Sequence, residues 1–85
     1  MKFITTKAIQ DKAGENLIVA LENLYRRFHQ GEYIYAFDIK DSKITIVTET
    51  NGKKHKAPQE NCFEGRIWIK DNSDGTALVM FPKEY

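Results

Sequence analysis

Apolar residues recur with a helical period in the first third of the chain. They follow the spacing i, i+4, i+7, i+8 and i+11, and comprise Leu17, Leu21, Leu24, Tyr25 and Phe28. This spacing places them along one side of an α-helix. We expect Asp11 to be the N-cap, Gly31 to end the helix, and Gly14 to weaken only its first turn. The pattern predicts one amphipathic helix between Asp11 and Gly31.

Runs rich in β-branched and aromatic residues follow this helix, and turn signals separate them. The predicted strands cover residues 33–40, 43–50, 65–70 and 76–82, with a basic return segment at 53–56. The predicted turns and loops are Asp41-Ser42, Asn51-Gly52, 57–61 and 71–75. Before the helix, residues 2–9 favour a short strand, and a helix that begins near Thr6 is the competing interpretation.

These elements predict a single α+β domain over residues 1–85. One amphipathic helix packs on a four- to five-stranded antiparallel sheet, in the order β-α-β-β-β-β. This order resembles that of cystatin-like folds, and it overlaps loosely with compact bacterial ribonuclease and toxin folds. The resemblance concerns topology alone, and none of the motif residues of these families is present, so it implies no activity.

Side chains alternate across a strand, and both predicted faces of the sheet are apolar. A helix of about 18 residues is roughly 27 Å long and covers only one of them. We expect the uncovered face to bind a partner. The exposed patch joins Trp68 to either Leu78 with Met80 or Val79 with Phe81. The first choice gives the candidate partner-binding residues, which are Trp68, Arg66, Lys70, Leu78 and Met80. The competing interpretation is a twisted sheet that wraps around its helix and leaves little apolar surface free.

Composition narrows the class of protein. The 85 residues are 41% apolar and 29% charged, as in folded domains, and a net charge of +1 gives no overall attraction to nucleic acids or anionic membranes.

Cys62 is the only cysteine, so no internal disulfide forms, and we expect it to be a small buried residue in a reducing compartment. The N-terminus lacks the apolar run of a signal peptide, so we expect a cytoplasmic protein without a membrane segment.

A basic segment supplies the alternative function. Lys53, Lys54, His55 and Lys56 follow the Asn51-Gly52 turn, and Arg66, Trp68 and Lys70 are candidates for a neighbouring strand. Lysines beside an aromatic ring suit phosphate neutralisation and base stacking, which favours a nucleic-acid-binding module. Three lysines at a hairpin are more often the protected edge of a sheet, which makes this the second choice.

Catalytic chemistry has little support in the sequence. His29, His55 and Cys62 are not spaced as a metal motif, so we expect no metal and no cofactor. A ribonuclease-like site would need His55, Arg66 and either Glu60 or Glu64 to converge, and these residue types are common. His29 is more simply a helix-terminal residue.

The sequence therefore favours a small non-enzymatic module that binds another protein. Such a module acts as an inhibitor by masking its partner's surface, and self-association through the same face is a further expectation. Its size alone suggests the small phage and mobile-element proteins that block host machinery.

Overall fold

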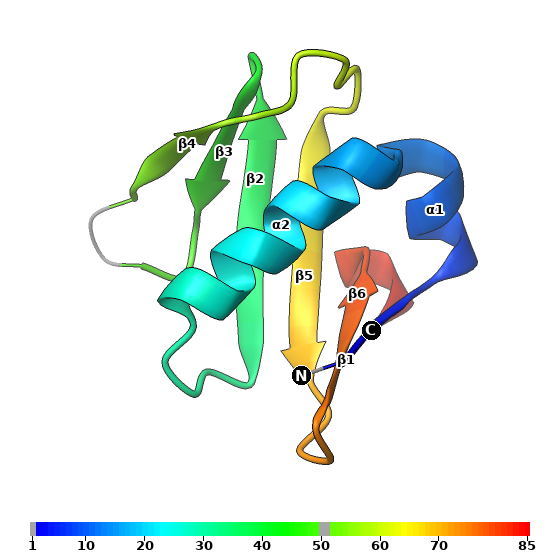
Figure 1. The fold of residues 1–85 in the computed structure, drawn as a ribbon, viewed down its shortest axis with the longest axis vertical. Helices are drawn as coiled ribbons and strands as arrows, with labels where there is room; N and C mark the ends of the chain where they lie inside the picture. Colours follow the sequence, from blue (N-terminus) through cyan, green and yellow to red (C-terminus); the bar gives the residue numbers. More distant parts are fainter. Residues whose placement is uncertain (1, 50–51) are drawn as a thin grey trace.

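The structure is a computed structural model, and it describes residues 2–49 and 52–85. Six strands form one mixed sheet in the order β1-β6-β5-β2-β3-β4, and helix α2 crosses one side of it (Figure 1). The elements are β1 (Lys2–Thr5), α1 (Lys7–Ala13), α2 (Glu15–Phe28), β2 (Ile34–Lys40), β3 (Lys43–Ile46), β4 (Lys54–Lys56), β5 (Gly65–Asp71), β6 (Thr76–Met80) and the 3₁₀ helix η1 (Pro82–Glu84). The predicted α+β class is confirmed.

The helical region consists of two helices, so the prediction of a single helix was wrong. Gly14 separates α1 from α2 with φ +80° and ψ 152°, a conformation that breaks the helix completely. Asp11 lies inside α1, and the N-cap is Thr6, whose hydroxyl accepts a hydrogen bond from the Ile9 amide at 3.3 Å. The strand predicted before the helix and the competing helix that begins near Thr6 are both present, as β1 and α1. Helix α2 ends at Phe28, before Gly31.

The sheet has more strands than predicted, and it is mixed. Residues 2–9 were expected to form one strand, but they divide between β1 and the start of α1. Strand β1 pairs in parallel with β6, with Lys2 beside Thr76 and Thr5 beside Val79. The other four pairings are antiparallel, as predicted. The prediction of a purely antiparallel sheet with four to five strands was thus wrong in strand number and in one pairing. The cystatin-like order β-α-β-β-β-β was wrong too, because two helices follow β1 and five strands follow the helices.

The turn between β2 and β3 is where the sequence predicts it. Asp41 and Ser42 have φ values of +53° and +61°, positive at both positions as in the tight turns that join twisted strands. The other predicted hairpin turn includes Asn51, which lies outside the described residues, and β3 ends at Ile46 rather than at residue 50.

The core lies between the sheet and the two helices. Leu17, Leu21 and Tyr25 of α2 face the sheet, and Ile9 and Ala13 of α1 extend the same cluster. The sheet contributes Tyr35, Phe37, Ile39, Ile44, Ile46, Ile67, Ile69, Ala77 and Val79. Helix α2 therefore covers the face that carries Tyr35, Phe37 and Ile39. Cys62 is exposed, so the expectation that it fills the core was wrong.

Candidate functional site

The side of the sheet away from α2 carries the candidate site, which we call the open face. Its residues are the strand positions that alternate with the core positions. Lys2 pairs with Thr76 at one end of this face, and the strand register arranges the other residues in four rows: Ile4, Leu78, Lys70 and Ile34; Met80, Trp68 and Ala36; Arg66, Asp38, Thr45 and Lys54; and Lys40, Lys43 and Lys56. The first two rows are mainly apolar, and the last two are mainly polar and basic. The face thus has an apolar half and a cationic end.

Three aromatic rings gather on the apolar half. Tyr85, from the C-terminus, packs edge-on against Trp68 with ring centroids 5.9 Å apart. The ammonium group of Lys70 lies 5.7 Å from the ring of Tyr33 and 5.9 Å from that of Tyr85. A hydrogen bond with Tyr85 and the nearby Lys70 ammonium lower the pKa of the Tyr33 hydroxyl. The cluster combines rigid aromatic surface with a cation.

Exposure separates the residues that a partner can touch from those that support them. Tyr85 is 66% exposed, Tyr33 52% and Ile4 46%, while Met80 is only 1% exposed. Trp68, Leu78 and Lys70 are half-buried, and Arg66 is exposed. All five predicted partner-binding residues lie on the open face, but Met80 lies beneath it and supports Trp68 instead of offering contact surface.

Sequence reasoning missed Tyr85, Tyr33 and Ile4 as members of the site. Tyr33 precedes the first residue of β2, and Tyr85 follows a 3₁₀ turn that returns the chain end toward Trp68. Ile4 joins the face because β1 pairs with β6. The position of each of these residues depends on contacts between distant parts of the chain, which local periodicity cannot predict.

The cationic end contains one ion pair and a shallow hollow. Arg66 donates two hydrogen bonds to the Asp38 carboxylate, at 2.7 and 3.0 Å, and these bonds lower the pKa of Asp38. Both residues line a hollow of about 740 Å³. Its remaining lining residues are Ile39, Lys40, Asp41, Lys43, Thr45, Lys54, Glu64 and Gly65.

The basic segment at 53–56 does not form one patch. Lys54 and Lys56 lie on the open face, whereas His55 packs against Phe28 of α2 with ring centroids 5.2 Å apart. The ammonium of Lys53 also lies over the Phe28 ring, at 5.1 Å. Strands β2 and β3 separate β4 from β5, so the idea that Arg66, Trp68 and Lys70 lie on a neighbouring strand was wrong. Strand β4 is at the edge of the sheet.

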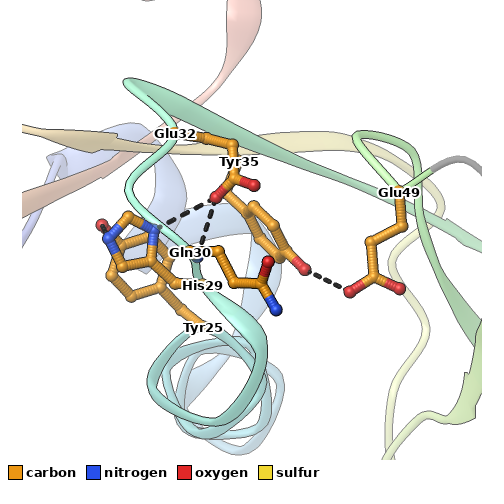
Figure 2. A network of polar contacts seen from close by, with 6 residues as sticks. All are labelled: Tyr25, His29, Gln30, Glu32, Tyr35 and Glu49. Carbon is orange, nitrogen blue, oxygen red and sulfur yellow. Dashed lines mark hydrogen bonds and ion pairs between the residues drawn. The ribbon is translucent and has the colours of Figure 1, made fainter.

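A second polar cluster lies where α2 ends (Figure 2). The imidazole of His29 stacks on Tyr25 at 4.3 Å, and its Nδ1 lies 3.5 Å from the Glu32 carboxylate. The hydroxyl of Tyr35 donates a 2.7 Å hydrogen bond to Glu49. Burial, together with the Glu49 hydrogen bond and charge, raises the pKa of Tyr35 well above its usual range.

This cluster connects elements of the fold. The Glu32 carboxylate also accepts a hydrogen bond from the backbone amide of Gln30 at 2.9 Å, which together with the His29 contact holds the turn after α2. The Tyr35 bond attaches β2 to the segment after β3. Within residues 2–49 and 52–85, no group of three or more His, Cys, Asp and Glu side chains is arranged to hold a metal ion. Because its contacts join α2, the turn after it, β2 and the segment after β3, we interpret the cluster as structural.

The residues of the ribonuclease-like hypothesis do not converge. His55 packs on the helix side of the sheet, whereas Arg66 is bonded to Asp38 on the open face. The Glu60 carboxylate accepts a hydrogen bond from Asn16 at 3.4 Å, and that of Glu64 accepts one from the Asp41 amide at 2.9 Å.

The fold and the site together define a small α+β domain with two helices on one side of a sheet and an amphipathic open face on the other. Comparisons with family models, with curated proteins and with solved structures found no match to this chain. Neither α1 nor α2, the α-helices in the described part of the chain, has the length and apolar character needed to cross a membrane.

Proposed function

We propose that this protein is a non-enzymatic binding module that holds another protein against its open face and masks part of that partner's surface. The observation that carries the proposal is the aromatic cluster on the side of the sheet that α2 leaves uncovered, in which Tyr33 and Tyr85 are exposed and Trp68 is half-buried. An inhibitor of this kind needs no chemistry of its own. A reducing cytoplasmic location suits the free thiol of Cys62.

The arrangement has the features of an interface core. Aromatic residues and arginine supply much of the binding energy in protein interfaces, and the aromatic rings bury a large area at a small cost in side-chain entropy. Trp68 lies at the centre of the row that joins β6, β5 and β2, and its backbone is held by strands on both sides. The surface is thus formed before the partner arrives, which lowers the cost of ordering it.

Nucleic-acid binding through residues 53–56 remains the alternative, and the geometry favours it less. Only Lys54 and Lys56 of that segment reach the open face. The rings that could stack on bases, Tyr33 and Tyr85, lie on the apolar half, whereas Lys54 and Lys56 lie at the cationic end. A shift of labelled single-stranded DNA that weakens with salt and is lost on replacing both lysines would favour the alternative.

The proposal is tested by partner capture with two matched variants. Ile4 and Val19 are 46% and 45% exposed, and they lie on the open face and on α2 respectively. We expect tagged protein with Ile4→Ser to lose a partner from cells of its native source, and Val19→Ser to retain it. Capture is measured by mass spectrometry, and melting curves check that both variants are folded. Equal retention by the two variants would contradict a partner site on the open face.

A further inference from the structure

We infer that the partner presents an acidic surface beside an apolar anchor, with the anchor on the aromatic half of the open face and the carboxylates over its cationic end. This inference rests on the proposed function and specifies the partner's chemistry. It follows from the distribution of charge over the two sides of the sheet.

Basic side chains concentrate on the open face. Of the 13 lysines and arginines in the chain, seven occupy its strand positions: Lys2, Lys40, Lys43, Lys54, Lys56, Arg66 and Lys70. Of the 12 acidic residues, only Asp38 does. The net charge of +1 is therefore the sum of a strongly basic sheet face and an acidic remainder of the molecule. Such a field attracts and orients an acidic partner.

The lysines at the cationic end are available to a partner. Lys40, Lys43 and Lys56 form one cross-strand row, and all three are exposed. Arg66 with Asp38 is the only ion pair that the described residues make on this face. Like charges on neighbouring strands repel one another, so partner carboxylates would relieve a repulsion that the free protein carries.

Two acidic groups at the edge of the hollow do not neutralise this end. Asp41 lies in the turn between β2 and β3, and Glu64 precedes β5. The Glu64 carboxylate is engaged by the Asp41 amide at 2.9 Å. With both counted, basic side chains still outnumber acidic ones on this surface.

The same charges disfavour a second copy of the chain as the occupant. Packing two open faces together would bring many lysines into one interface with few carboxylates, and unpaired charges are costly to desolvate. A nucleic acid would satisfy the charge but not the apolar half, where Ile4, Leu78 and Ile34 offer no phosphate contact. A protein with acidic and apolar groups side by side satisfies both halves.

Trp68 provides the assay, because it is the only tryptophan in the chain and lies on the open face. The probe is a synthetic peptide of alternating glutamate and leucine, titrated while Trp68 fluorescence is recorded. A lysine–leucine peptide is the charge-reversed control, and an oligothymidylate is the nucleic-acid control. We expect only the glutamate–leucine peptide to saturate the signal, with an affinity that falls as salt is added.

Two double variants of equal net charge locate the binding. Lys43→Glu with Lys54→Glu reverses charge at the cationic end, whereas Lys7→Glu with Lys12→Glu does so on α1. We expect the first to weaken peptide binding by about tenfold or more, and the second to weaken it less than about twofold, because screened charges act mainly over short range. Thermal melts confirm that both variants fold.

The outcomes are distinct. Tighter binding of the oligothymidylate, equal loss in both double variants, or no binding of the acidic peptide would each overturn the acidic-partner inference. Tighter binding of the oligothymidylate would also favour the nucleic-acid alternative, whereas the other two results leave the proposed function standing. That function fails if Ile4→Ser still retains the cellular partner. Conversely, loss of that partner by Ile4→Ser but not by the Lys43 and Lys54 variant would retain the site and reject the acidic chemistry.

Discussion

Tyr35 is the residue at which the apolar core and the polar network meet. Its side chain is 1% exposed, and its ring packs edge-on against Tyr25 and Phe37, with centroids 6.0 and 5.3 Å away. The hydroxyl at the end of this buried ring reaches the Glu49 carboxylate (Figure 2). A hydrogen bond to a carboxylate is stronger than one between neutral groups. One side chain thus fills the core and attaches the segment after β3.

Replacing Tyr35 by phenylalanine keeps the ring and removes only this bond. We expect Tyr35→Phe to lower the free energy of unfolding by about 1.5–3 kcal/mol, since hydrogen bonds to charged groups contribute that order of stability. Tyr33→Phe is the matched control, because Tyr33 is 52% exposed, and we expect a change within about 0.5 kcal/mol. Urea unfolding measures both. An equal loss in the two variants would contradict the role given to the Glu49 bond.

The same tyrosine makes stability depend on alkaline pH. Burial raises the pKa of Tyr35 above the ordinary value of about 10, and the Glu49 hydrogen bond and charge raise it further. A tyrosine is neutral when protonated, so the raised pKa means that the folded state binds the proton more tightly than the unfolded state. The stabilisation is complete below the unfolded pKa and is lost as pH rises through the folded pKa.

We therefore expect the free energy of unfolding to fall as pH rises above about 10, by up to about 1.4 kcal/mol per pH unit for this group. Tyr25 adds to the slope, because burial, Asp71 and Glu32 raise its pKa too. Urea unfolding at a series of alkaline pH values measures the slope. Tyr35→Phe should make it shallower, and an unchanged slope in that variant would show that other groups cause it.

At the scale of the elements, Gly14 decides the shape of the helical region. Apolar periodicity located α2 correctly, but periodicity does not reveal that a glycine adopts a non-helical conformation. The combination of φ +80° and ψ 152° turns the chain between α1 and α2, so that Ile9 and Ala13 enter the core from a separate helix. Local patterns also could not predict the parallel pairing of β1 with β6, because it joins residues more than seventy positions apart.

A side chain at position 14 would oppose that conformation. We expect Gly14→Ala to lower the free energy of unfolding by about 1–3 kcal/mol, although an added Cβ would meet no atom within 4 Å, because L-residues rarely adopt this backbone region. The cost is therefore conformational and not steric. Chemical denaturation measures it, and a loss below about 0.5 kcal/mol would show that the junction relaxes into a continuous helix.

Ser42 supplies the opposite control for this backbone argument. It has φ +61° in the turn between β2 and β3, where glycine is favoured. We expect Ser42→Gly to be neutral or to raise stability by about 0.5–1 kcal/mol. If Gly14→Ala and Ser42→Gly both lowered the free energy of unfolding, the conformational explanation of Gly14 would fail.

At the scale of the whole molecule, the sequence predicted several residues of the candidate site but not how the strands arrange them into one surface. The alternation of residues in 65–70 correctly placed Trp68, Arg66 and Lys70 on one side. For 76–82 it left both faces open, and the register of β5 with β6 selects the one with Leu78 and Met80. The arrangement of the lysines depends on strand order, because β4 and β5 contribute to one face although β2 and β3 lie between them. Local sequence carries little information about which strands are neighbours. The cationic end could therefore be identified only from the strand order in the structure.

This charge distribution has a consequence that needs no partner to measure. A basic surface concentrates anions near it and repels cations, and the Lys70 and Arg66 positions flank Trp68 along β5. We expect iodide to quench Trp68 fluorescence more strongly than caesium does, by a ratio larger than that for free tryptophan. Added chloride should reduce the excess of iodide quenching as it screens the field.

The two double variants are the controls. Lys43→Glu with Lys54→Glu should lower the iodide-to-caesium quenching ratio further than Lys7→Glu with Lys12→Glu, because only the former pair lies on the same face as the indole. Equal ratios for protein and free tryptophan would mean that no such field reaches the centre of the open face.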